Sequence, residues 1–185
     1  MNRAKNTGLV LCGLVLGLSL SAPAAQAVES LKATLSTNRI LVDGQEVRLT
    51  AYNINGNNYV MLRVNDKLMQ AAQVRADEMA SSSVYSHTRP DGRRNTSVTD
   101  CPYVGENIHR IADWALQGKS VSEAAVWSWN LSGGHRDNLL EKNYAETGVG
   151  LSRGVNDSGE ACWYCVQLFL WNGYSISWVD TPAAK

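Results

Sequence analysis

The N-terminal 27 residues decide how much of this chain can enter a folded domain. Arg3 and Lys5 precede an almost uninterrupted apolar run at residues 8–20, and small residues follow at Ala25-Gln26-Ala27. A basic start, an apolar stretch and a small-residue cleavage site are typical of a secretory signal peptide. The apolar run, about 13 residues long, is too short to span a bilayer comfortably. The sequence therefore predicts that residues 1–27 are a cleaved signal peptide and that the mature chain is extracellular, secreted and without a transmembrane segment.

The mature chain has the size of one compact domain with a small accessory unit, since removing 27 of the 185 residues leaves 158. Two of the 17 basic residues lie in the leader, so 15 remain against 17 acidic residues, and they form no basic run or stripe. Nucleic acid and anionic membrane surfaces are recognised through such patches, so neither is expected as a partner. The expected partner is an unidentified extracellular or cell-surface ligand.

Three cysteines remain after cleavage, at Cys101, Cys162 and Cys165. An odd number outside the cell allows at most one internal disulfide, with one thiol left over or bonded to another molecule. Cys162 and Cys165 lie three residues apart in the strand-like run CWYCVQLFLW, so their side chains would point to opposite faces. They would not easily bond to each other or share a metal. We expect a disulfide that joins Cys101 to Cys162 or to Cys165.

Residues 28–61 are predicted to form a small β meander. Strand-like segments flank Asp43-Gly44 and, further on, Asn55-Gly56, and both dipeptides are typical of two-residue hairpin turns. The pattern indicates about three strands, starting at residue 39. A unit of this size is too small to be stable alone, so it should pack on the domain that follows.

The middle of the chain has helical patterns and the end returns to strands, which indicates an α+β fold. Asn65 or Asp66 can cap a first helix, and Ser120 with Glu123 forms a capping box for another. The expected elements are a helix from about 65 to the serine run 81–83, a mostly irregular stretch at 84–105, a second helix at 106–117 ending at Gly118, a third from Ser120, a short fourth at about 136–142, and strands at 147–153 and 162–171 around a polar turn at 156–159.

Chemistry-bearing side chains are few, because the chain has only three histidines. His109 lies beside Ile108 in the predicted second helix and is interpreted as a solvated or edge residue. His87 and His135 lie beside turn residues, where a side chain can face a cleft. Glu106 stands at a predicted helix start, where a carboxylate is also favoured electrostatically. Two imidazoles and a carboxylate can bind a divalent metal, form a polar network or act as an acid–base pair, but their spacing matches no local metal motif.

Five segments, in this order, resemble the signature of bacterial CAP domains, the SCP-like group of cysteine-rich secretory, antigen 5 and pathogenesis-related proteins. The resemblance runs from about Leu62 to Trp171, and we expect residues 62–185 to form the domain. It implies an α-β-α sandwich with a cleft, in which His87, Glu106 and His135 correspond to three members of the group's polar tetrad. The segments are SHTRPDG (86–92), VGENI (104–108), WNLSGGHRDNLL (129–140), GVGL (148–151) and CVQLF (165–169).

Two features depart from that pattern. Ser132 stands where many eukaryotic relatives have a second glutamate, which weakens a two-glutamate acid–base mechanism and leaves a His–His pair able to bind zinc or another divalent ion with water. In place of the usual first CAP helix, residues 42–63 resemble half of the small repeat called the copper amine oxidase N-terminal domain. This N-terminal β-hairpin extension has no His, Cys or Met cluster, so no copper site is expected.

The resemblance favours a secreted, non-catalytic binding or interaction protein with a His/Glu cleft for a divalent ion, zinc being the first choice. The sequence has no GxSxG elbow, His-Glu-x-x-His helix or phosphate loop. One alternative is a metal-dependent, peptidase-like hydrolase in which Glu106 polarises a water held by His87 and His135, with Ser132 as a further candidate. Another is a lipid- or sterol-binding protein whose groove is lined by tryptophans, although tryptophans at such spacings more often pack in cores; these are Trp127, Trp129, Trp163 and Trp171.

Overall fold

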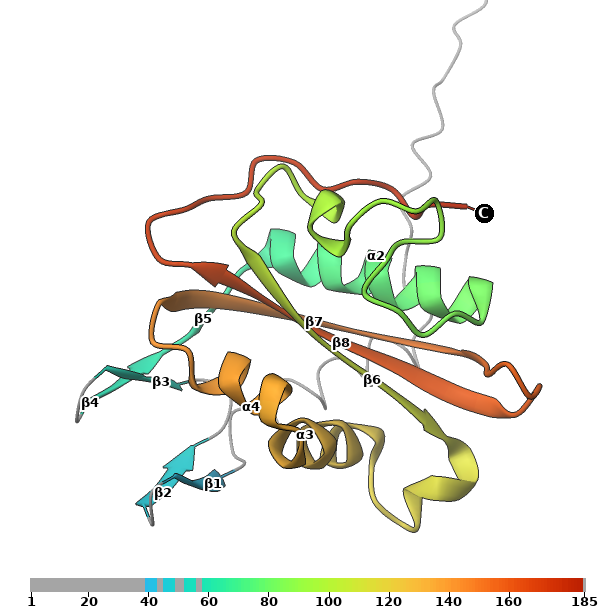
Figure 1. Cartoon of the computed structure of the whole chain (residues 1–185), viewed down its shortest axis with the longest axis horizontal. Helices are drawn as coiled ribbons and strands as arrows, with labels where there is room; N and C mark the ends of the chain where they lie inside the picture. Colours follow the sequence, from blue (N-terminus) through green and yellow to red (C-terminus); the bar gives the residue numbers. More distant parts are fainter. Residues whose placement is uncertain (1–38, 43–44, 49–51, 56–57, 185) are drawn as a thin grey trace, which may run out of the picture.

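A four-stranded sheet lies between two helical layers (Figure 1). The computed structural model describes residues 39–42, 45–48, 52–55 and 58–184, with the backbone alone in strands up to Met61. Helix α2 (Asp66–Ser82) covers one face of the sheet, and α3 (Val121–Leu131) and α4 (Gly133–Leu140) cover the other. The predicted α+β class and α-β-α sandwich are therefore confirmed. The predicted signal peptide lies outside the described residues.

The sheet has the strand order β5-β7-β8-β6, so β6 forms one edge. Strand β5 runs parallel to β7, and the β7–β8 and β8–β6 pairs are antiparallel. The hairpin between β7 and β8 turns at Asn156–Gly159, as predicted, with Gly159 at φ 78° and its N–H donating to the Asn156 carbonyl at 2.9 Å. The four strands are β5 (Arg63–Val64), β6 (Val104–Ala112), β7 (Tyr144–Val155) and β8 (Ala161–Trp171).

The N-terminal strands form two separate antiparallel pairs instead of one meander of three strands. The pairs are β1 (Arg39–Val42) with β2 (Gln45–Arg48), and β3 (Tyr52–Asn55) with β4 (Asn58–Met61). The first pair flanks the predicted turn at residues 43–44, which lie outside the described part of the chain. Asn55, predicted to belong to the second turn, is instead the last residue of β3 and pairs with Asn58, while residues 56–57 are not described.

Helix boundaries follow the local capping signals. The Asn65 side chain accepts hydrogen bonds from the N–H groups of Lys67 and Leu68 at 2.9 and 3.1 Å, and α2 ends in the serine run, with Ser83 in the left-handed region. The capping box between Ser120 and Glu123 is present at the start of α3. Helix α4 begins at Gly133, three residues earlier than predicted. No helix in the described ranges is long and apolar enough to cross a membrane.

The helix predicted at 106–117 is wrong, because this stretch is strand β6 followed by a 3-10 turn, η2 (Asp113–Leu116). Ile108 and Ile111 have a helix-like spacing, but the whole of β6 pairs with β8. In a strand alternate residues share a face, so Glu106 and Ile108 point toward α2 while Asn107 and His109 point toward the α3 and α4 layer. Pairing with a distant strand has overridden the local pattern.

The disulfide predicted for Cys101 does not form, and Cys101, Cys162 and Cys165 are buried free thiols in the described chain. Cys101 precedes β6 at its Val104 end, whereas Cys162 lies opposite Ala112 at the other end. These ends are eight residues apart, roughly 26 Å at about 3.3 Å per residue, while a disulfide needs Cα atoms within about 7 Å. Cys165 belongs to the core on the opposite face of the sheet, so Cys101 reaches neither cysteine.

Helix α2 approaches β7 so closely that glycine is needed in the strand. A Cβ atom on Gly150 would lie 2.4 Å from the backbone carbon and oxygen of Ala72. We expect Gly150→Ala to lower the free energy of unfolding by about 1–3 kcal/mol, because helix and strand must move apart. Urea denaturation measures the change. Gly134→Ala is the control: an added Cβ there meets no atom within 4 Å, so a loss as large as that of Gly150→Ala would contradict the steric explanation.

Candidate functional site

Three of the predicted site residues lie around the edge strand β6. Glu106 lies on β6, His87 on the loop that follows α2, and His135 in the first turn of α4. Side chains from both layers hold this edge, since the Ile108 carbonyl accepts from the Tyr85 hydroxyl and from the Trp129 indole N–H, each at 3.0 Å. The site thus lies at a strand edge whose Ile108 carbonyl already accepts hydrogen bonds within the chain.

Glu106 and His87 are in direct contact. His87 Nδ1 lies 2.7 Å from Glu106 Oε1, which also accepts from Asn95 Nδ2 at 3.1 Å. The other oxygen, Oε2, accepts from Arg75 Nε at 2.9 Å. An ionised carboxylate can only accept, so we assign the imidazole hydrogen to Nδ1 of His87, which leaves Nε2 with a free lone pair. The Glu106 side chain is buried, whereas that of His87 is 54% exposed.

His135 is held near this pair through its backbone. Its carbonyl accepts from Asn107 Nδ2 at 3.0 Å, and Asn107 Oδ1 accepts from Asn138 Nδ2 at 2.9 Å, which ties α4 to β6. The Nδ1 atom of the His135 ring is buried and has no hydrogen-bond partner in the described chain. Burial lowers the pKa of His135, and the nearby His87 lowers it further, so both imidazoles share one electrostatic environment.

His109 is a site neighbour that sequence reasoning missed. It lies on the edge strand, but it is not solvated: burial, assisted by the nearby His135, lowers the pKa of His109 to about 4. The neutral imidazole is therefore its form at ordinary pH, and its Nε2 atom is buried without a hydrogen-bond partner among the described residues. The mistaken helix placed this residue at the surface; the alternation of β6 would have placed it on the face of the sheet that α3 and α4 cover.

Ser132 lies between α3 and α4 without joining the polar site. Its N–H donates to the Ser128 carbonyl at 3.2 Å and its carbonyl accepts from Arg136 at 2.8 Å, while its hydroxyl makes no hydrogen bond in the part of the chain described. These backbone contacts place Ser132 at the end of α3 and the start of α4, so they support a structural role.

The donor set suits a metal less well than three free ligands would. Within residues 39–184, excluding the undescribed gaps, no group of three or more His, Cys, Asp or Glu side chains could hold a metal ion. Both Glu106 oxygens already accept hydrogen bonds, which leaves the imidazole nitrogens of His87 and His135 as the unpartnered atoms among the predicted ligands.

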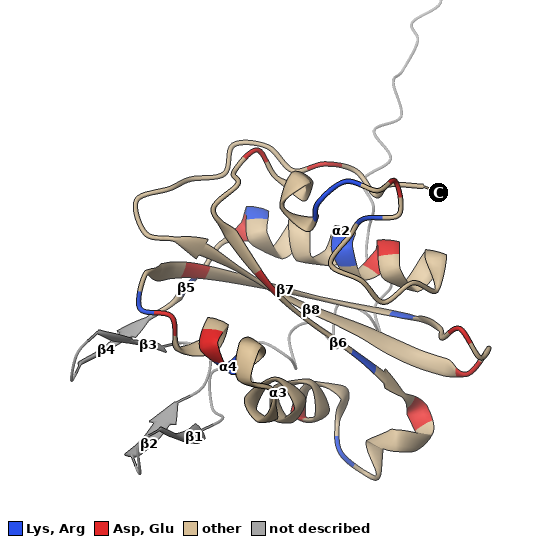
Figure 2. Ribbon diagram, in the orientation of Figure 1, with Lys and Arg blue, Asp and Glu red and all other residues tan. Residues whose placement is uncertain are grey.

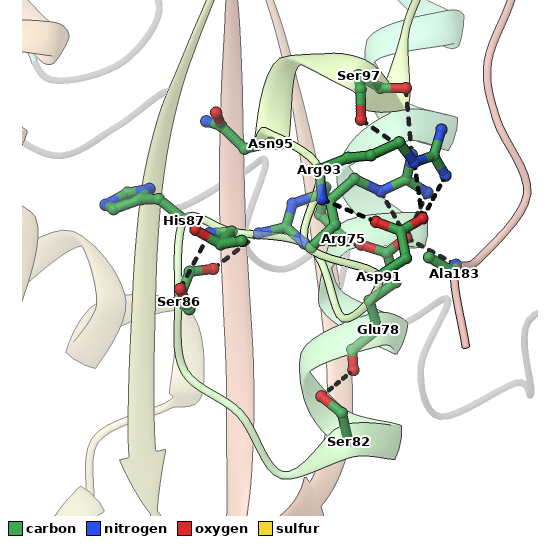
Figure 3. A network of polar contacts seen from close by, with 12 residues as sticks. Arg75, Glu78, Ser82, Ser86, His87, Asp91, Arg93, Asn95, Ser97 and Ala183 are labelled. Carbon is green, nitrogen blue, oxygen red and sulfur yellow. Dashed lines mark hydrogen bonds and ion pairs between the residues drawn. The ribbon is translucent and has the colours of Figure 1, made fainter. Parts of the chain in front are cut away.

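A buried ion-pair network lies directly behind the site (Figure 3). Arg75 on α2 donates to Glu106, to Glu78 Oε2 at 2.6 Å and to the Ser86 carbonyl at 2.8 Å. Glu78 Oε1 in turn accepts from Arg89 Nε at 2.9 Å. The side chains of Arg75, Glu78 and Arg89 are fully buried. Elsewhere, acidic and basic positions are interspersed over the described ribbon (Figure 2), in agreement with the absence of a basic stripe.

The tryptophans do not support a common ligand groove. Trp129 is fully buried and belongs to the core on the α3 and α4 side of the sheet, against which the half-buried Trp163 packs. Trp127, only two residues away, is 59% exposed on the solvent side of α3. Trp171 packs edge-on against Tyr144 at the end of β8. For Trp129, core packing is therefore the correct interpretation.

Three solved structures are similar to parts of this chain. An extracellular protein containing an SCP domain from Bacillus anthracis is 26% identical with a TM-score of 0.43; the match covers 60% of this chain and 34% of that one, so this chain spans about a third of its length. An outer surface protein from Borrelia burgdorferi is 15% identical with a TM-score of 0.39, over 80% and 87% of the two chains. BmVAL-1 is 13% identical with a TM-score of 0.45, over 91% and 88%. No curated protein matches the chain.

A family model matches residues 46–169, which is most of the chain. The match begins within the predicted N-terminal extension, whose resemblance to a copper amine oxidase repeat stays a prediction. It contains His87, Glu106 and His135 and the strands and helices that carry them. The chain therefore belongs to the cysteine-rich secretory protein family, CAP.

Proposed function

We propose that this protein is a secreted, non-catalytic binding or interaction protein whose His/Glu cleft binds a divalent metal ion, zinc being the first choice. Its partner would be an extracellular or cell-surface ligand. The leader-type N terminus and the description of the family as secretory support the location. The single observation that carries the binding proposal is the contact of His87 Nδ1 with Glu106 Oε1 at 2.7 Å.

This contact prepares His87 as a ligand. Because Glu106 accepts the Nδ1 hydrogen, the Nε2 lone pair is free, on a side chain that is 54% exposed. A carboxylate behind a histidine fixes the ring and raises its basicity in many zinc sites. His135, whose lowered pKa favours the neutral ring, would supply the second imidazole. Two further groups, water molecules or atoms of a bound ligand, would be needed beside the two imidazoles to give zinc four ligands, and the ion would polarise them.

Both carboxylate oxygens of Glu106 already accept hydrogen bonds, which favours a binding protein over a hydrolase. A general base needs a carboxylate oxygen within reach of the proton it removes. Here Oε1 accepts from His87 and Asn95, and Oε2 accepts from Arg75 in a buried ion pair. Ser132 is not activated either, since its hydroxyl has no hydrogen-bond partner among the described residues to act as a base. The hydrolase alternative would require these contacts to be broken first.

Zinc titration by calorimetry tests the proposal. We expect the wild type to bind one zinc ion per chain and the His87→Ala/His135→Ala double variant to lose at least about tenfold in affinity, because both imidazole ligands are gone. Asp157→Asn is a control outside the site, since Asp157 pairs with Arg110 on the surface.

The outcomes separate the alternatives. Equal zinc binding by the wild type and the double variant, or binding by neither, would show that the metal site is wrong. Zinc binding without turnover on a broad peptide panel would support a binding protein, whereas zinc-dependent peptide cleavage that disappears in the double variant would support the hydrolase instead.

A further inference from the structure

The chain after residue 169, where the family match ends, returns to the side of the sheet that α2 covers. Residues 176–183, here named the C-terminal clasp, follow β8 and run beside the loop that connects α2 to β6 (Figure 1). The family match ends at residue 169, before the clasp begins. We infer that the clasp is a positioning element for the candidate site, which holds the loop of His87 and, through buried ion pairs, the carboxylate of Glu106.

The clasp is anchored at its beginning by apolar and backbone contacts. Ile176 is buried in the core between α2 and the sheet. The N–H groups of Ser177 and Trp178 donate to the Asp100 carboxylate at 3.1 and 3.3 Å. Val179 forms an antiparallel bridge with Thr99. These contacts fix the path of the clasp next to the segment that leads into β6.

The middle of the clasp holds the His87 loop directly. Asp180 Oδ2 accepts from Arg89 Nη1 at 2.7 Å and from Arg93 Nη2 at 2.8 Å, and the Thr181 carbonyl accepts from Arg89 Nη2 at 3.0 Å. Arg89 is two residues from His87. Charge-assisted hydrogen bonds of this kind fix geometry as well as adding energy. Asp180 therefore helps to hold the loop that places His87 next to Glu106 on β6.

The end of the clasp acts through Glu78. The Ala183 N–H donates to Glu78 Oε1 at 2.8 Å (Figure 3). Glu78 in turn bridges Arg89 and Arg75. Arg75 then holds Glu106, which holds His87. Each charge in this series from Glu78 to Glu106 is buried and depends on its neighbours for hydrogen bonds, so a change at one end disturbs the pairing at the other. The clasp acts on the His87–Glu106 contact, which forms without a bound metal.

The tautomer of His87 reports this contact without metal. In metal-free protein, long-range proton–nitrogen NMR spectra distinguish a ring protonated at Nδ1 from one protonated at Nε2. We expect the Nδ1–H form in the wild type, and a loss of that form toward a mixture of both tautomers in Asp180→Asn and, to a smaller extent, in Arg93→Gln. Asp180→Glu, which keeps the carboxylate, should restore the wild-type spectrum. The control is Asp157→Asn, which removes a surface carboxylate paired with Arg110.

The ring signals of His109 serve as an internal control, because this residue faces the opposite side of β6. A shift of His87 with unchanged His109 signals supports the inference. An unchanged His87 tautomer in both folded variants would overturn it, and so would an equal shift of His87 and His109, since that would indicate a general loss of structure. The Arg93 side chain is partly exposed, so Arg93→Gln should fold even if Asp180→Asn does not. The tautomer of His87 can then be measured in that variant. The NMR result does not depend on whether zinc binds, so the zinc-site proposal can be wrong while the role of the clasp is confirmed, and the reverse.

Discussion

Replacement of Arg75 by methionine is expected to lower the free energy of unfolding by about 3–5 kcal/mol. The guanidinium donates to both Glu78 and Glu106, and all three side chains are fully buried. Without it, Glu106 keeps hydrogen bonds from His87 and Asn95 but has no cationic partner, and Glu78 keeps Arg89 as its ion-pair partner. A buried charge that loses its partner keeps its desolvation cost, so the loss greatly exceeds that of a surface pair. Urea denaturation with linear extrapolation measures it.

A matched substitution separates this effect from the general cost of removing an arginine. Arg63 pairs with Glu146 at 2.8 Å, but its side chain is 74% exposed, so Arg63→Met should cost less than about 1 kcal/mol. Adding Glu106→Gln to Arg75→Met should recover part of the lost stability, because it removes the buried carboxylate that has lost its cationic partner. Equal effects of the two arginine substitutions would contradict the assignment of Arg75 to a buried ion-pair network.

Elements with local signals were predicted well from the sequence. The caps at Asn65 and Ser120 depend on side chains within three residues of the helix start, and both helices begin where these signals place them. His87 and Glu106, predicted as site partners, are in direct contact. Their proximity came from the family signature and not from spacing, since nothing local relates a loop residue to a strand residue 19 positions later.

Elements defined by distant contacts could not be predicted in this way. Strand β6 exists because it pairs with β8, nearly sixty residues later, and its apolar residues alone also fit a helix. The same error hid His109. The network behind the site joins Arg75 and Glu78, an ordinary i,i+3 pair by sequence, to Arg89 and Asp180 from two other segments. Only the tertiary structure shows that these charges are buried together.

The second large effect is expected at Trp129, whose indole joins α3 to the edge strand. Trp129 is fully buried beside Leu139 and Phe169, and its N–H donates to the Ile108 carbonyl at 3.0 Å. We expect Trp129→Ala to lower the free energy of unfolding by about 3–5 kcal/mol, because a large cavity remains between helix and sheet. Urea denaturation of the variant checks this value.

Two further substitutions test why Trp129 matters. Trp127→Ala changes the same residue type on the same helix at a 59% exposed position, so it should stay within about 0.5 kcal/mol of the wild type. Trp129→Phe keeps most of the apolar volume, and the Ile108 carbonyl keeps the Tyr85 hydroxyl as a donor, so a smaller loss than for alanine is expected. If Trp127→Ala and Trp129→Ala were equally destabilising, α3 would not pack on the sheet through Trp129. The position of His135 on the following helix would then need another explanation, because α3 and α4 are joined at Ser132.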